Sequence, residues 1–71
     1  MTRYYFNVSA ENESGTDLVG IDLPSLEAAR HHAISQVTEL WAERLLLGKQ
    51  PLAGWLEVVD DEARAALRLP L

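Results

Sequence analysis

The segment between Pro24 and Pro51 most constrains how this chain can fold, because it carries the signals that begin and end one long helix. Ser25 is a good N-cap, since its hydroxyl can accept a hydrogen bond from the first free amides of a helix. Gly48 is placed to adopt the left-handed C-terminal cap, and Pro51 prevents continuation. We therefore predict a single helix that extends from Ser25 to about Leu47.

The predicted helix is amphipathic. At about 100° per residue its apolar side chains gather into one stripe. That stripe consists of Leu26, Ala29, Ala33, Val37, Leu40 and Trp41. The opposite arc consists of His31, His32, Ser35, Gln36, Glu39 and Glu43. Such a helix should lie across an apolar surface that the rest of the chain provides.

Four segments on either side of the helix alternate with the period of two that is typical of half-buried strands. They are residues 3–9, 17–23, 54–60 and 64–69. Their predicted inward side chains are Tyr4, Phe6, Val8, Val19, Ile21, Leu23, Leu56, Val58, Ala65, Leu67 and Leu69. Residues 10–16 should form a surface loop, and residues 60–63 a turn that lacks the glycine preferred in tight hairpins.

This order predicts an α+β fold, ββαββ, in which one long helix packs on one face of a four-stranded, mainly antiparallel sheet. Residues 1–71 form one small domain, because 71 residues cannot be divided into two independent cores. The strand order stays open, since either hairpin could occupy the centre of the sheet.

Composition excludes several functions. Six Lys and Arg stand against eleven Asp and Glu, the net charge is −5, and the cations are scattered. Nucleic acids and anionic membranes are therefore disfavoured as partners, because both attract clustered cations. With no cysteine, disulfides and thiolate metal sites are ruled out. No apolar run reaches the roughly 18 residues of a membrane span, and the start resembles no signal peptide, so we expect a cytoplasmic protein.

The titratable side chains give no sign of catalysis or of a cofactor. His31 and His32 are adjacent, so on a helix they diverge by about 100° and cannot hold one metal ion together. They are expected to be exposed. The acidic run at residues 60–62 is interpreted as a solvated turn, with weak calcium binding as its alternative. We expect no metal, no cofactor and no enzyme activity.

The second face of the sheet is the candidate site. One helix covers only one face, so aromatic, aliphatic and Arg side chains remain on the other, a composition enriched at protein interfaces. The candidate contact residues are Arg3, Tyr5, Asn7, Trp55, Val59 and Arg68, with Leu18, Glu57 and Ala66 beside them. We expect homodimerisation or binding of another protein through this face. The alternative is an ordinary half-solvated antiparallel face.

The chain resembles a group of short bacterial proteins catalogued only as a domain of unknown function. The resemblance lies in the opening Arg3-Tyr4-Tyr5-Phe6, in the passage from Asp17 through Gly20, Asp22 and Pro24 into an Ala-rich helix, and in the closing segment 56–62. It covers nearly the whole chain and implies a fold and a bacterial source. Asn7 stands where the family more often has Asp or His, and Ala63 where its hairpin usually has Gly.

The layout is also similar to that of HicB-type antitoxins, in which an aromatic strand and a strand ending in Leu-Pro precede the helix. With the net charge of −5, this likeness supports a second hypothesis. The protein would then be an acidic regulatory inhibitor, or an antitoxin-like protein, that masks a basic partner.

Overall fold

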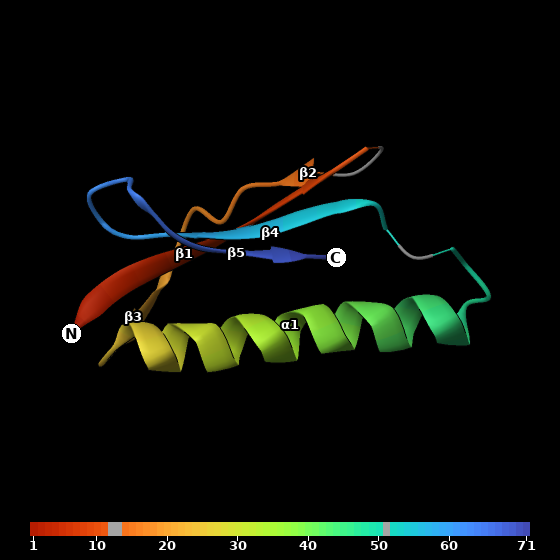
Figure 1. Cartoon of the computed structure of the whole chain (residues 1–71), viewed down its shortest axis with the longest axis horizontal. Coiled ribbons are helices and arrows are strands. Elements are labelled where there is room, and N and C mark those ends of the chain that lie inside the picture. Colours follow the sequence, from red (N-terminus) through yellow and green to blue (C-terminus); the bar gives the residue numbers. More distant parts are fainter. Residues whose placement is uncertain (12–13, 51) are drawn as a thin grey trace.

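The computed structural model describes residues 1–11, 14–50 and 52–71, and it has one helix beneath an antiparallel sheet (Figure 1). In chain order the elements are β1 (Thr2–Ala10), β2 (Ser14–Gly15), β3 (Ile21–Leu23), α1 (Leu26–Leu46), β4 (Gly54–Val59) and β5 (Ala65–Pro70). The predicted α+β class is confirmed. The predicted number of strands is wrong, because the sheet has five strands instead of four.

The strand order is β2-β1-β4-β5, and β3 also pairs with β1. All pairings are antiparallel. The two middle strands, β1 and β4, come from different hairpins and join them, with Phe6 opposite Val58 and Val8 opposite Leu56. Each half of the chain therefore contributes one central strand, which answers the question that the sequence left open.

The second predicted strand, residues 17–23, is the main correction. Only Ile21–Leu23 is extended, while β2 at Ser14–Gly15 lies inside the predicted loop; residues 12 and 13 of that loop are outside the described residues. Val19, predicted to face the core, is exposed. The Asp17 carboxylate accepts a hydrogen bond from the backbone N–H of Phe6, at the edge of β1 where a continuous second strand would have paired.

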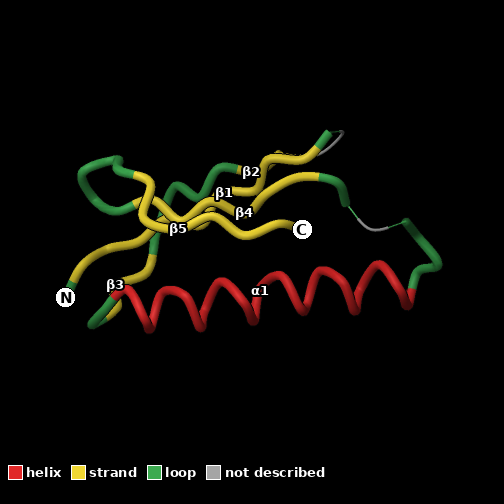
Figure 2. The backbone as a smooth tube through the Cα atoms, viewed as in Figure 1, coloured by secondary structure: helices red, strands yellow, loops and turns green. Residues whose placement is uncertain are grey.

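The core is small. Among the described residues, six are buried: Tyr4, Phe6, Ala29, Ala33, Leu56 and Val58. Because Ala29 and Ala33 have short side chains, the backbone of α1 can lie close to the sheet. Only one part of the helix packs in this way, and its C-terminal turns run on past the end of β5 (Figure 2). The core therefore lies between the sheet and the N-terminal half of α1.

The inward face of α1 is rotated relative to the predicted stripe. Ala29, Ala33 and Val37 pack on the sheet as predicted, but Leu26 and Trp41 are exposed. His32 and Gln36, predicted for the polar arc, are instead half-buried. The Ala residues fix this rotation, because a close backbone approach contributes more contact than the larger side chains at the two ends of the stripe.

Both predicted helix ends are confirmed, although Pro51 lies outside the described residues. The N–H of Ala28 donates to the hydroxyl of Ser25 over 3.1 Å. Gly48 has a φ of 67°, and its N–H donates to the carbonyl of Leu45, while the N–H of Lys49 donates to that of Arg44. These two bonds form a Schellman motif.

The last strand departs from simple alternation. A register shift between Val58 and Val59 breaks the pairing of β4 with β5. As a result Ala66 packs against the core and Ala65 is exposed, the reverse of the prediction, whereas Leu67 and Leu69 face inward as predicted.

Candidate functional site

The predicted contact residues do share the sheet face that points away from α1. Along β1 and β4 they alternate with buried residues of the core, so their side chains project to the other side. Cross-strand pairing places Tyr5 opposite Val59. Glu57 lies between Asn7 of β1 and Arg68 of β5. We call this surface the outer sheet face; it comprises Arg3, Tyr5, Asn7, Trp55, Val59 and Arg68.

Charged side chains cover part of the outer sheet face. The guanidinium carbon of Arg68 lies 4.4 Å from the centroid of the Trp55 ring, a cation–π arrangement. Trp55 is still 42% exposed. This face therefore presents the partly exposed Trp55 ring beneath the guanidinium of Arg68, as either a protein contact or a solvated sheet face would.

Arg3 joins the outer sheet face to the loop before β3. Its guanidinium donates to both carboxylate oxygens of Asp22, over 2.9 and 3.0 Å, and to the carbonyl of Val19 over 3.1 Å. These hydrogen bonds and the charge of Arg3 hold the pKa of Asp22 below its usual value, and Asp22 raises the pKa of Arg3. Gly20 has a φ of 76°, and its bare Cα lets this loop lie against Arg3.

The sequence did not reveal the role of Asp17. Its Oδ1 accepts from the N–H groups of Val19 and Gly20, its Oδ2 accepts from the N–H of Phe6, and its own N–H donates to Oδ1 of Asn7. The amide bonds, that from Gly20 foremost, lower the pKa of Asp17 against the opposing effect of burial. An Asp three residues before a Gly is the one signal that could have indicated this loop.

The two histidines have different surroundings. His31 is exposed, as predicted, and its Nε2 lies 3.4 Å from the carboxylate of Glu27. His32, also predicted to be exposed, instead stacks obliquely on Phe6 with ring centroids 4.6 Å apart. Because His32 and Ala29 are three residues apart on α1, they share one face of the helix. The small size of Ala29 and Ala33 is the sequence signal that could have placed His32 inward.

An open pocket of about 330 Å³ lies between β1, α1 and the loop before β3. It is lined by Phe6, Val8, Gly15, Thr16, Asp17, Ile21, His32 and Gln36. Although it brings a carboxylate near an imidazole, three backbone amides already occupy the oxygens of Asp17. In the described part of the chain, no three His, Asp or Glu side chains are grouped to hold a metal ion.

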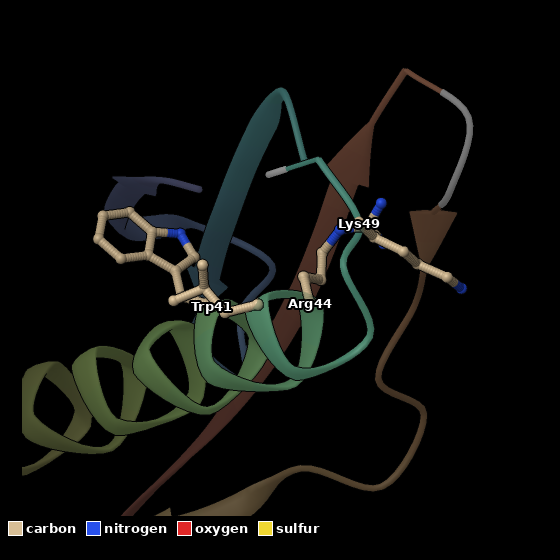
Figure 3. A pocket seen from close by; sticks show the side chains of 4 residues that line it. Trp41, Arg44 and Lys49 are labelled. Carbon is tan, nitrogen blue, oxygen red and sulfur yellow. The ribbon is translucent and has the colours of Figure 1, made fainter.

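A second, smaller pocket of about 120 Å³ lies at the C-terminal end of α1 (Figure 3). It is lined by Trp41, Arg44, Leu45 and Lys49. The indole of Trp41 extends from the helix on one side, and the side chain of Lys49 projects from the chain beyond the helix end. Here apolar side chains and two cations share an exposed surface.

The fold and these surfaces define a class of small α+β domains in which one long helix covers one face of an antiparallel sheet. The family model described as "Domain of unknown function (DUF6894)" matches residues 3–71, so the chain belongs to this family and the resemblance seen in the sequence is confirmed. No curated protein and no solved structure gives a significant match. Within the described residues, no helix is long and apolar enough to span a membrane.

Proposed function

We propose that this protein is a non-enzymatic protein–protein interaction module that forms a homodimer. One observation carries the proposal, which is the imbalance between a small core and a large exposed apolar surface. Of the six buried residues only Leu56 and Val58 are large and fully buried, while eleven large hydrophobic residues in the described chain are exposed. Contiguous exposed apolar surface on a soluble domain typically marks a contact with another molecule.

Energetics favour the same function. Burying apolar area contributes about 25 cal/mol per Å², and a domain of this size has little of it to bury within one chain. Two indoles, those of Trp41 and Trp55, are among the exposed side chains, and Trp is enriched among the residues that dominate interface energies. A second copy would supply the apolar area that a single chain lacks.

The titratable groups support a role without catalysis. The Asp17 oxygens bind backbone amides, Asp22 binds Arg3, and Asp60 binds the amides of its own turn. Hydrogen bonding to the charged forms lowers the pKa of all three carboxyls. A general acid at neutral pH needs a raised pKa, so these carboxylates are suited to holding loops instead.

Two surfaces of the molecule are candidates for the contact. The outer sheet face offers Tyr5, Trp55 and Val59, and the exposed side of α1 offers Trp41 and Leu45. On the outer sheet face Arg68 already covers part of Trp55. The helix surface has more exposed apolar side chains.

Sedimentation equilibrium of the purified chain tests the proposal. We expect a dimer at micromolar concentration, and a Trp55→Glu variant that is monomeric if the outer sheet face makes the contact. A wild-type chain that stays monomeric up to about 100 μM, well above the dissociation constants typical of functional homodimers, would contradict the proposal. Recovery of the chain with a small basic protein, and never with itself, would favour the acidic inhibitor instead.

A further inference from the structure

The exposed side of α1 carries a regular seam. Ile34, Trp41 and Leu45 are 44%, 52% and 79% exposed. With Thr38 between them, their positions differ by four, three and four residues, which is the spacing of a coiled-coil seam. We call these four residues the helix seam. It lies well away from the buried face that Ala29 and Ala33 mark, so the sheet leaves it accessible.

We propose that the helix seam binds a second copy of this chain, with the two helices antiparallel and the two-fold axis passing near Thr38. This inference rests on the proposed function and identifies the surface that carries it. In this arrangement Ile34 of one copy faces Trp41 of the other, since the two residues lie about equally far from Thr38 on opposite sides.

Charge complementarity selects the antiparallel orientation. Glu27 and Lys49 each lie eleven residues from Thr38. For Glu27 this is about 16 Å along the helix, and Lys49 lies just beyond the end of α1 at Leu46. An antiparallel pair places Glu27 beside Lys49 of the partner subunit, whereas a parallel pair would place Glu27 beside a second glutamate. Glu27 is exposed, with its carboxylate 3.8 Å from Arg30 and 3.4 Å from His31 on its own helix. The Schellman motif fixes the backbone of Lys49 at the helix end through its 2.9 Å bond to the carbonyl of Arg44.

The pocket in Figure 3 fits the same arrangement. Trp41 and Leu45 of the helix seam line it, and Arg44 and Lys49 give it a cationic rim. The approaching half of a second helix carries Ile34 and, toward its N-terminal end, Arg30, His31 and Glu27. An apolar side chain followed by a carboxylate therefore meets an apolar pocket bordered by cations, which gives a two-fold symmetric contact used twice in one dimer.

Sedimentation equilibrium of two variants tests the surface. Trp41→Glu should raise the dimer dissociation constant by about 30-fold or more, because buried Trp residues act as hot spots. Leu46→Glu is the matched control, since Leu46 is 88% exposed on the same helix but off the seam, and it should leave the dimer intact. Circular dichroism should show both variants folded.

The outcomes separate the inference from the proposed function. A Trp41→Glu variant that still dimerises, together with a monomeric Trp55→Glu variant, would overturn the helix seam and leave the homodimer standing on the outer sheet face. A wild-type monomer would overturn both. Loss of the dimer in Trp41→Glu but not in Leu46→Glu supports the helix seam.

Two further experiments test the antiparallel register. Glu27→Lys should weaken the dimer, and Lys49→Glu added to it should restore wild-type affinity; absence of rescue would overturn the pairing. The chain has no cysteine, so Thr38→Cys introduces a single thiol next to the two-fold axis. On oxidation it should form a covalent dimer faster than Ser35→Cys, which is off the seam, because disulfides need Cα atoms within about 7 Å. Equal rates would contradict a two-fold axis near Thr38.

Discussion

Ala63 adopts a backbone conformation that favours glycine. Its φ is 61°, and its N–H donates to the carbonyl of Asp60, while the N–H of Asp60 donates to the carbonyl of Arg64. These bonds define a three-residue hairpin loop whose last position is left-handed, where glycine is preferred. The carboxylate of Asp60 also accepts from the N–H groups of Glu62 and Arg64, which helps to hold the turn with alanine in place.

We therefore expect Ala63→Gly to stabilise the protein. The left-handed conformation costs a non-glycine residue about 1–2 kcal/mol, and the added freedom of glycine in the unfolded chain offsets part of that gain. The expected net increase in the free energy of unfolding is about 0.5–1 kcal/mol. Urea denaturation should show a higher midpoint at an unchanged slope. As a control, Ala65→Gly, in the adjoining strand, should destabilise.

Asp17 closes the loop that replaces part of the second predicted strand. In Asp17→Asn one oxygen becomes an NH₂ group, which cannot accept from Phe6 or from the Val19 and Gly20 amides. We expect a loss of about 1–3 kcal/mol in the free energy of unfolding at pH 7, since hydrogen bonds to charged groups contribute in that range. Chemical denaturation would measure it, and a loss below about 0.5 kcal/mol, the scatter of surface substitutions, would contradict this role.

The ionisation of Asp17 also predicts how the stability of the protein depends on pH. Because the folded-state pKa of Asp17 lies below its unfolded value, its ionised form stabilises the fold above about pH 4. That contribution is lost as the pH falls through the folded-state pKa. Wild-type stability should therefore decline below pH 4 more steeply than that of Asp17→Asn. A decline remains in the variant, since Asp22 and Asp60 also have lowered pKa values.

At the scale of elements, the sequence predicted the helix ends most reliably, because local hydrogen bonds and backbone conformation determine them. Both ends of α1 follow from the hydroxyl of Ser25 and the glycine at position 48, which act within one turn of the helix. The strands β1 and β4 follow from alternation, whereas in β5 alternation predicted the strand but not the register shift that reverses Ala65 and Ala66. The segment at residues 17–23 could not be predicted, because the Asp17 carboxylate accepts a hydrogen bond from the N–H of Phe6, eleven residues earlier, and hydrophobic alternation does not reveal such a bond.

The sequence predicted which residues share the candidate site but not how their side chains contact one another. Alternation placed Tyr5, Trp55 and Val59 on one face, since a strand must send successive side chains to opposite sides. Alternation could not show that Arg68 lies over Trp55, because that contact depends on the rotamers of both side chains. The rotation of α1 was also hidden, because hydrophobicity weights Trp41 above Ala33 whereas close packing favours the smaller residue.

At the scale of the whole molecule, several residues on which the sequence resemblance rests also hold the sheet together. Arg3 binds Asp22, and Asp17 binds the amide of Gly20 within the same motif. These contacts fasten the loop between β2 and β3 to β1. These residues therefore have a structural role in the fold, and the exposed side of α1 takes no part in these contacts.

If the protein is a homodimer, its stability against unfolding depends on the chain concentration, and the last prediction follows from that dependence. When two folded copies unfold together, each tenfold increase in chain concentration stabilises the dimer by about 1.4 kcal/mol, or about 0.7 kcal/mol per chain. For a domain of this size that corresponds to a rise in Tm of roughly 3–6 °C. Scanning calorimetry of the wild type between about 10 and 100 μM, a range chosen to exceed a micromolar dissociation constant, should show this rise.

The Trp41→Glu variant provides the decisive comparison, since it should melt at a Tm that does not change with concentration, as expected of a monomer. Leu46→Glu should follow the wild type, because it adds the same charge to the same helix away from the seam. If all three proteins melt independently of concentration, the exposed apolar residues of α1 do not stabilise the fold by association. If only Trp41→Glu loses the dependence, the second copy supplies through this helix the apolar contacts that a 71-residue chain cannot make alone.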